Sequence, residues 1–185
     1  MPMRLDALLI PGCALVRSQV IGDDRGSFLK VFRRTSLAAE GFQLTWPEVY
    51  TSTSHKGVIR GMHFQTPPAD HEKLVFCLSG EIDDVVLDLR RGSPTFGDHL
   101  KVPLRADGTG VLVPRGCAHG FLARSPDAMM LYCVATEHVP DNDKGVRWDS
   151  FGCDWGEAAP TISARDRALP PLAAFDTPFV YRADR

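Results

Sequence analysis

The sequence predicts an all-β protein, an antiparallel β-barrel of the jelly-roll type with a few short helices. Many short stretches rich in strand-forming residues follow one another, and several alternate between apolar and polar positions. Within 82–89, for example, Val85, Leu87 and Leu89 are separated by Val86 and Asp88, the period of a partly buried strand. Turn residues such as Ser79-Gly80 and Asp107-Gly108 separate the stretches. Short strands at this spacing are typical of an antiparallel barrel or double-sheet jelly roll, because βαβ units need intervening helices.

The pattern places strands and helices at defined positions. Strands are predicted at 27–32, 48–54, 57–65, 73–78, 82–89, 99–104, 110–113 and 129–136. One helix is predicted at 35–40 and another from Ser163, where Ser163 and Asp166 suit an N-terminal cap. We expect a single domain over 1–185, with an N-terminal strand arm over about 1–20 and a C-terminal arm over about 148–185.

Composition excludes several function classes. The chain has 185 residues, 44% of them hydrophobic, and a formal net charge of -2. A nucleic-acid partner is not expected, because neutralising many phosphates needs a clear basic excess. No stretch reaches the roughly 18 apolar residues of a membrane span, and the short apolar run at the N-terminus lacks the longer apolar core expected of a signal peptide. Five scattered cysteines without a CxxC pair favour reduced thiols in a cytoplasmic protein.

A short motif points to one barrel superfamily. Gly108, Pro114, Gly116 and His119 follow the pattern G-x5-P-x-G-x2-H, which resembles most of the second signature of the cupins, a jelly-roll fold. Ala123 replaces the asparagine of the full signature. A strand that enters a tight Pro/Gly turn allows the histidine on the next strand to face the barrel interior. The resemblance therefore implies a cupin-type barrel with His119 in its pocket.

The ligand set of metal-binding cupins is incomplete in this sequence. His63 is followed by Phe64 and Gln65, so the HxH pair of those proteins is absent. His71 and Glu72 are adjacent, and neighbouring strand residues point to opposite faces. A three-ligand metal site is therefore not expected, and we expect no metal or other cofactor.

Longer segments carry a more specific resemblance. They are GDDRGSF, GVIRGMHFQ, EKLVFCLSGEIDDVVLDLRRGSPTFG, VPRGCAHGFL, LYCVATEHVP, KGVRWD and ISARDRALP, in this order over residues 24–170. Together they are similar to the dTDP-4-dehydrorhamnose 3,5-epimerase family of isomerases. The resemblance implies an enzyme that inverts C3 and C5 of a nucleotide-linked 4-keto-6-deoxyhexose through an enolate.

The family resemblance implies four catalytic residues. His63 resembles the base, and an imidazole suits proton abstraction at neutral pH. Asp166 resembles the acid that orients it and stabilises the imidazolium. Tyr132 resembles the acid that reprotonates the opposite face, and Lys73 the cation that stabilises the enolate oxygen. Taken singly, these residues are more often a structural histidine, a helix cap, a core tyrosine and an edge charge; their joint occurrence in ordered segments favours catalysis.

The substrate-binding residues follow partly from the resemblance and partly from strand parity. His119 and Arg60 complete the family's polar pocket, and Arg25 resembles a ligand of the substrate diphosphate. Parity places Gln65 on the same strand face as His63 but Arg60 on the other. For Arg60 to reach the pocket, the strand needs a bulge near Gly61, or the arginine must act from the rim. The alternative is that both arginines are solvated surface residues.

Four further positions depart from the family together. Glu48 and Tyr50 replace a Gln-x-Asn pair that helps to hold thymine, and Glu137-His138 replaces an aromatic pair near the base. Drift at a tolerant rim is one explanation. Our hypothesis is a nucleotide other than dTDP, because a carboxylate at Glu48 accepts hydrogen bonds from guanine or cytosine better than from thymine.

Alternatives to the two-centre epimerase remain open. They are a single-centre C3 or C5 epimerase or ketoisomerase of a GDP- or CDP-linked keto sugar, a non-catalytic sugar-nucleotide-binding cupin, and a metal-dependent cupin oxygenase. Members of the family are generally homodimers in which an N-terminal strand contributes to the neighbour's pocket. The apolar segment 8–16 is compatible with such an arrangement.

Overall fold

The structure is a computed structural model that describes residues 3–42 and 45–183. Its strands are β1 Arg4–Ala7, β2 Ala14–Arg17, β3 Val20–Asp23, β4 Gly26–Leu29, β5 Glu48–Ser54, β6 Ile59–Gln65, β7 Lys73–Ser79, β8 Glu81–Asp88, β9 His99–Arg105, β10 Thr109–Val113, β11 Cys117–Ala123, β12 Ala128–Val134 and β13 Asp143–Gly145. The α-helices are α1 Arg34–Ala39 and α2 Ala164–Arg167, and the 3-10 helices are Pro140–Asn142 and Leu172–Ala174. Within these ranges no helix is long and apolar enough to cross a membrane.

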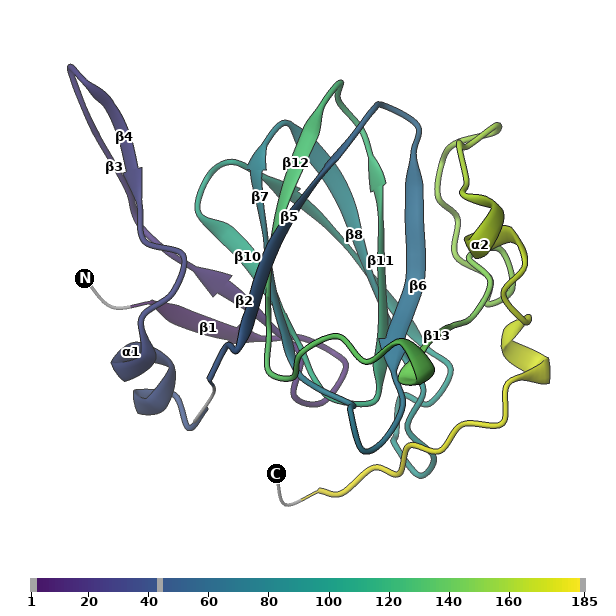
Figure 1. Ribbon diagram of the computed structural model, residues 1–185. Coiled ribbons are helices and arrows are strands. Elements are labelled where there is room, and N and C mark those ends of the chain that lie inside the picture. Colours follow the sequence, from purple (N-terminus) through teal and green to yellow (C-terminus); the bar gives the residue numbers. More distant parts are fainter. Residues whose placement is uncertain (1–2, 43–44, 184–185) are drawn as a thin grey trace.

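Two antiparallel sheets face each other around a central space (Figure 1). One has the strand order β1-β2-β10-β7-β12-β5, and the other has the order β13-β6-β11-β8-β9. The third sheet is the hairpin of β3 and β4, which projects away from the barrel. The predicted all-β jelly-roll class is therefore confirmed.

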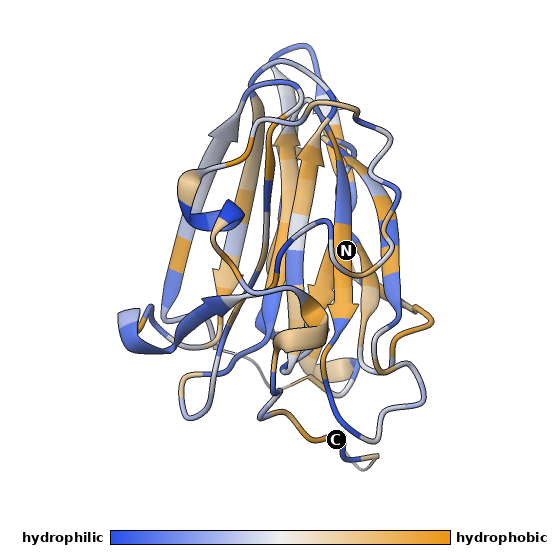
Figure 2. Ribbon diagram, turned by 90° about the vertical axis from the view of Figure 1, so that its right-hand side faces the viewer, coloured by the Kyte–Doolittle hydropathy of each residue, from blue (hydrophilic) through white to orange (hydrophobic). Residues whose placement is uncertain are grey.

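Three hydrophobic clusters hold these layers together. The cluster between the sheets joins Val75 and Val111 of one sheet to Val86 and Phe121 of the other. A second cluster lies on the outer face of the five-stranded sheet, which the arm from Val146 onward covers. The third places α1 against the outer face of the six-stranded sheet. Apolar residues accordingly concentrate along the central strands (Figure 2), and their burial is the main force that closes the barrel.

The predicted strands and helices agree with the structure within a few residues. The strand predicted at 27–32 is shorter, because β4 ends at Leu29. β1, β2, β3 and β13 are too short for a clear sequence period. The turn before β11 was the only sequence signal for this strand. Its seven residues are all buried, so the sequence shows no alternation of apolar and polar residues there.

The C-terminal arm packs back on the barrel, as expected. Lys101 on β9 donates a hydrogen bond of 2.5 Å from Nζ to the carbonyl of Asp154 in the arm.

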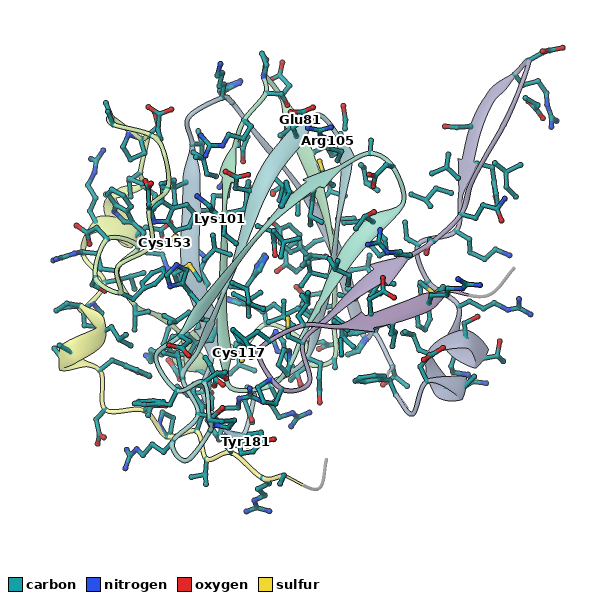
Figure 3. All side chains as sticks on the ribbon, turned by 180° about the vertical axis from the view of Figure 1, so that it is seen from behind. Glu81, Lys101, Arg105, Cys117, Cys153 and Tyr181 are labelled. Atoms are coloured by element: carbon teal, nitrogen blue, oxygen red, sulfur yellow. The ribbon has the colours of Figure 1, made fainter. Side chains whose placement is uncertain are left out.

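Figure 3 shows Cys153 beside Lys101 and Cys117 in a different part of the molecule. All five cysteines are unpaired, and burial raises the pKa of the Cys153 thiol to about 11. These thiols therefore act as small packing groups at neutral pH.

Candidate active site

A cavity of about 370 Å³ opens between the two sheets and collects most of the predicted site residues. Nine of them line it: Glu48, Tyr50, Arg60, His63, Gln65, Lys73, His119, Tyr132 and His138. The lining also contains residues that the sequence did not single out, among them Ser52, Asp143 and Arg165. The sequence prediction of one shared pocket thus has a clear structural counterpart.

His63 on β6 is supported from behind by Asp166 on α2. Its Nε2 lies 2.7 Å from Asp166 Oδ1, and the other carboxylate oxygen accepts a hydrogen bond of 3.3 Å from the Gly61 amide. Ser163 caps α2 by accepting a hydrogen bond from the Asp166 amide, as predicted. Burial alone would raise the pKa of the Asp166 carboxyl, but the hydrogen bonds from His63 and Gly61 outweigh it and lower the pKa. The ionised carboxylate holds the proton of neutral His63 on Nε2, so Nδ1 is the basic nitrogen.

Arg60 reaches the same cavity through a β-bulge. His119 pairs with His63, and Phe121 pairs with Arg60, so two steps along β11 match three along β6. The extra residue reverses the parity of Arg60, which is the first of the two alternatives left open by the sequence. Gly61 has a φ of +143°, and a Cβ there would lie 2.6 Å from the Gly120 Cα. Only glycine fits this bulge.

A second histidine–carboxylate pair lies beside the first. His119 Nε2 is 2.7 Å from Asp84 Oδ1, and both side chains are buried. Asp84 was not among the predicted site residues. A signal was present, because Asp84 shares its strand face with Ile82 and Val86, which belong to the cluster between the sheets.

Tyr132 approaches from the opposite sheet, on β12. Its hydroxyl lies 3.2 Å from Ser52 Oγ, and its ring stacks on Tyr50 with centroids 4.7 Å apart. The side chain is almost completely buried, and this desolvation raises the pKa of the Tyr132 hydroxyl. Tyr132 is therefore a protonated phenol that faces the histidines across the cavity.

Lys73 is the first residue of β7, lines the cavity and is buried. Its Nζ donates a hydrogen bond of 3.3 Å to the backbone carbonyl of His63. Burial lowers the pKa of this ammonium group to about 8, partly opposed by the negative charge of Asp143. The group is still mostly cationic at neutral pH and suits a developing oxyanion.

The mouth of the cavity is held by charged and amide side chains. Glu48 Oε2 accepts a hydrogen bond of 2.7 Å from the backbone amide of His138. Asp143 binds His138 at 3.2 Å and Arg165 at 2.8 Å. These contacts fix the segment 137–139 beside β5.

Gln65 reinforces the same segment from β6. Its Oε1 accepts a hydrogen bond of 2.6 Å from the Val139 amide, and its Nε2 lies 3.1 Å from the Ala69 carbonyl and 3.2 Å from the Glu137 carbonyl. Both amide protons are thus used within the protein. The substrate-binding role of Gln65 stays a prediction, and its contacts describe a residue that supports the mouth.

Arg25 lies outside the cavity of its own chain. It is at the turn of the β3–β4 hairpin, where its side chain is 90% exposed and pairs with Asp23. Its predicted contact with the substrate diphosphate is therefore not formed within one chain.

A larger cavity of about 1030 Å³ lies elsewhere, between the C-terminal segment and the loops around Pro114. Two of its arginines are paired, since Arg115 binds Glu72 at 3.1 Å and buried Arg90 binds Asp88 at 2.8 Å. None of the predicted catalytic residues lines it, so we take the smaller cavity, which His63, Lys73 and Tyr132 line, as the candidate active site. Over residues 3–42 and 45–183, no group of three or more His, Cys, Asp or Glu side chains is arranged to hold a metal ion.

Known proteins share this fold and much of this sequence. A family model described as dTDP-4-dehydrorhamnose 3,5-epimerase matches residues 7–174. The enzyme of that name from Salmonella typhimurium is 36% identical over 168 residues, which cover 88% of this chain and 92% of the relative.

Solved structures agree with this match. A dTDP-6-deoxy-D-glucose-3,5-epimerase from Legionella pneumophila, in complex with dTDP-4-keto-L-rhamnose, is 29% identical with a TM-score of 0.92 and covers 98% of this chain and 100% of its own. A 3'-monoepimerase from Streptomyces bikiniensis in complex with dTDP-quinovose is 32% identical with a TM-score of 0.85, covering 90% and 86%. The chain therefore belongs to the dTDP-4-dehydrorhamnose 3,5-epimerase family.

Proposed function

We propose that this cavity inverts C3 and C5 of a nucleotide-linked 4-keto-6-deoxyhexose, with His63 as the base and Tyr132 as the opposing acid. Family membership makes the chain an epimerase, an isomerase of nucleotide-linked deoxysugars. One observation supports these roles above all: His63 and Tyr132 come from opposite sheets and line the same cavity. A sugar between them presents one ring face to each.

The first half of the reaction is proton removal. The 4-keto group acidifies the hydrogens on its neighbours, C3 and C5, because the carbanion that forms is an enolate. Nδ1 of His63 takes the proton, and the ionised Asp166, 2.7 Å from Nε2, stabilises the imidazolium. Lys73 offsets the charge on the enolate oxygen, an effect of about 3 kcal/mol for a preorganised donor.

The second half is reprotonation from the other face. Tyr132 donates its proton to the enolate carbon, which inverts that centre. Because burial raises the pKa of the phenol, the proton stays on the oxygen until a strong base such as the carbanion arrives. Arg60 and His119 bind the polar groups of the substrate at the cavity wall.

The nucleotide is the part of the substrate where a second candidate has support. The relatives named above act on or bind dTDP sugars. Glu48, however, accepts the His138 amide with Oε2, and its Oε1 forms no hydrogen bond within residues 3–42 and 45–183. A carboxylate pairs well with the N–H groups of guanine or cytosine, whereas thymine has carbonyl oxygens on both sides of its single ring N–H. Calorimetry with dTDP, GDP and CDP distinguishes these cases, and tightest binding of dTDP would remove this candidate.

We also propose a homodimer in which the β3–β4 hairpin reaches the neighbouring subunit. A two-stranded hairpin alone is marginally stable in water. Ile21 and Phe28 on this hairpin are 46% and 58% exposed, and Val49 on the edge strand β5 is 55% exposed. A second copy of the chain would cover these residues and bring Arg25 to the neighbour's cavity.

Complementation between two inactive variants tests this arrangement. Arg25→Ala and His63→Ala subunits, mixed and refolded together, form heterodimers with one cavity that has both residues intact. We expect recovery of about a quarter of wild-type activity for random mixing in a two-fold dimer. No recovery, with dimers present by ultracentrifugation, would place Arg25 outside the neighbour's site.

The remaining expectations are that the chain works as one domain and in the cytoplasm. The C-terminal arm shares a hydrophobic cluster with the five-stranded sheet, which supports a single folding unit. Five unpaired cysteines support a reducing compartment.

One experiment tests the central proposal. The protein is incubated in D2O with 4-keto-6-deoxy sugars linked to each nucleotide, and the mass and configuration of the sugar are followed. Two deuteriums with inversion support the 3,5-epimerase, and one supports a single-centre enzyme like the similar monoepimerase. No incorporation with any substrate would indicate a binding protein and contradict the proposal.

A further inference from the structure

Each inversion leaves the enzyme in the wrong protonation state for the next one. This follows from the proposed function, because His63 gains a proton on one face while Tyr132 loses one on the other. His63 has a direct route to water, since its side chain is 26% exposed. Tyr132 is only 6% exposed, so its phenolate needs a proton donor within reach.

Ser52 is the group in that position. Its Oγ lies 3.2 Å from the Tyr132 hydroxyl, and either oxygen can be the donor. No other hydrogen bond is formed by the Tyr132 hydroxyl within residues 3–42 and 45–183. Ser52 lies on β5, the edge strand of its sheet, is half-buried and lines the cavity. Its hydroxyl thus connects a buried phenol with a water-accessible surface.

Three other polar residues lie near Tyr132, and none of them makes a hydrogen bond to its hydroxyl within the described residues. His119 meets the tyrosine ring edge-on with centroids 6.1 Å apart, and its Nε2 is bound to Asp84. Arg60 donates from Nε to Ser54 Oγ at 2.9 Å, and a guanidinium does not give up a proton in proteins. Tyr50 covers one face of the ring by stacking.

We propose that Ser52 returns a proton to Tyr132 after each inversion. The Tyr132 O–H bond breaks as the new C–H bond forms, which leaves a phenolate. The phenolate takes the Ser52 hydroxyl proton, and the Ser52 oxygen takes one from water. The hydroxide that results is neutralised by the proton that His63 releases, so the cycle balances without another reactant. Because desolvation makes this phenolate strongly basic, a weak acid such as a hydroxyl group suffices.

The test separates the first inversion from the second. Enzyme in excess is mixed with substrate in D2O, and rapid quenching followed by mass spectrometry gives the rate of each deuterium. In Ser52→Ala we expect the first deuterium within about twofold of wild type and the second about tenfold slower. Ser52→Thr keeps a hydroxyl on an edge strand and should restore the second step. If only one centre is inverted, the mixing is repeated with substrate in excess, and the rates of the first and second turnovers replace those of the two deuteriums.

An added proton donor provides an independent readout. Imidazole buffer should accelerate the second deuterium in Ser52→Ala and leave the wild type unchanged. Equal slowing of both deuteriums would mean that Ser52 only aligns Tyr132, and no slowing would mean that water resets the phenol; either result overturns the relay. If Tyr132→Phe still inverts both centres, Tyr132 is not the acid, and the proposed proton relay is wrong as well. If only the Ser52 predictions fail, the proposed function is unaffected.

Discussion

Two histidine–carboxylate pairs lie side by side in this protein. They have the same distance between nitrogen and oxygen but differ in solvent exposure and in the hydrogen bonds of the carboxylate. His63–Asp166 and His119–Asp84 both have Nε2 and Oδ1 2.7 Å apart, and the two histidines are paired across β6 and β11. His63 is 26% exposed, and both oxygens of Asp166 have donors. His119 is 4% exposed, and Asp84 Oδ2 has no hydrogen-bond partner within the described residues.

The difference shows that the same pair of side chains can have two functions. The imidazole of His63 is accessible from the cavity, and its partner carboxylate keeps a second donor in the Gly61 amide. A fully buried pair with an unsatisfied carboxylate oxygen is expensive to disrupt, because removing one partner leaves an uncompensated buried charge. We therefore expect the first pair to control catalysis and the second to control stability and the shape of the cavity.

The largest effect should come from removing the two histidines separately. His63→Ala removes the base, so deuterium exchange should fall about 10³-fold with little change in Tm. His119→Ala leaves Asp84 without its partner and should lower the free energy of unfolding by about 3 kcal/mol. Rapid-quench exchange and urea denaturation measure the two quantities. Exchange at the wild-type rate in His63→Ala would end the catalytic assignment of that pair.

Replacing the two carboxylates should again affect activity in one pair and stability in the other, with smaller effects than replacing the histidines. Asp166→Asn cannot stabilise the imidazolium, so kcat should fall about 10²-fold while the protein stays folded. Asp84→Asn removes a buried charge and keeps a polar atom near His119, so unfolding free energy should change by about 1–2 kcal/mol in either direction. A loss of activity in Asp84→Asn equal to that in Asp166→Asn, at unchanged stability, would contradict the division between the pairs.

Lys73 acts in the same proposed reaction as His63, and its titration should make both activity and stability depend on pH. Because its pKa is lowered to about 8, kcat/KM should fall as pH rises through that value, by about tenfold per pH unit beyond it. Stability should respond in the opposite direction. The unfolded chain keeps the lysine protonated up to its ordinary pKa of 10.5, so it binds more protons than the folded chain above pH 8. Lys73 therefore makes the folded state more stable as pH rises from about 8 to 10.5, while the reaction slows over the same range.

The His63–Asp166 pair could be predicted from the sequence, whereas the pairing of His119 with Asp84 could not. The proposed catalytic residues lie in segments that match the family, and strand parity left two ways for Arg60 to reach the cavity, of which the structure has the bulge. Asp84 was missed because its significance depends on β8 lying next to β11, a long-range pairing that local periodicity does not reveal. Arg25 shows the same limit, since one chain cannot show which cavity its exposed hairpin reaches.

The mouth segment 137–139 should affect neither pair, which makes it a control for both. Glu48→Gln keeps an oxygen that accepts the His138 amide, whereas Glu48→Ala loses this contact. If Glu48 mainly holds the segment, KM should rise about threefold in the alanine variant, remain near wild type in the glutamine variant, and leave kcat and Tm unchanged in both. If Glu48 reads a donor-rich base, the glutamine variant should also raise KM, because its amide group presents donors where the base needs acceptors. The KM of the glutamine variant therefore decides whether this position supports the mouth or selects the nucleotide.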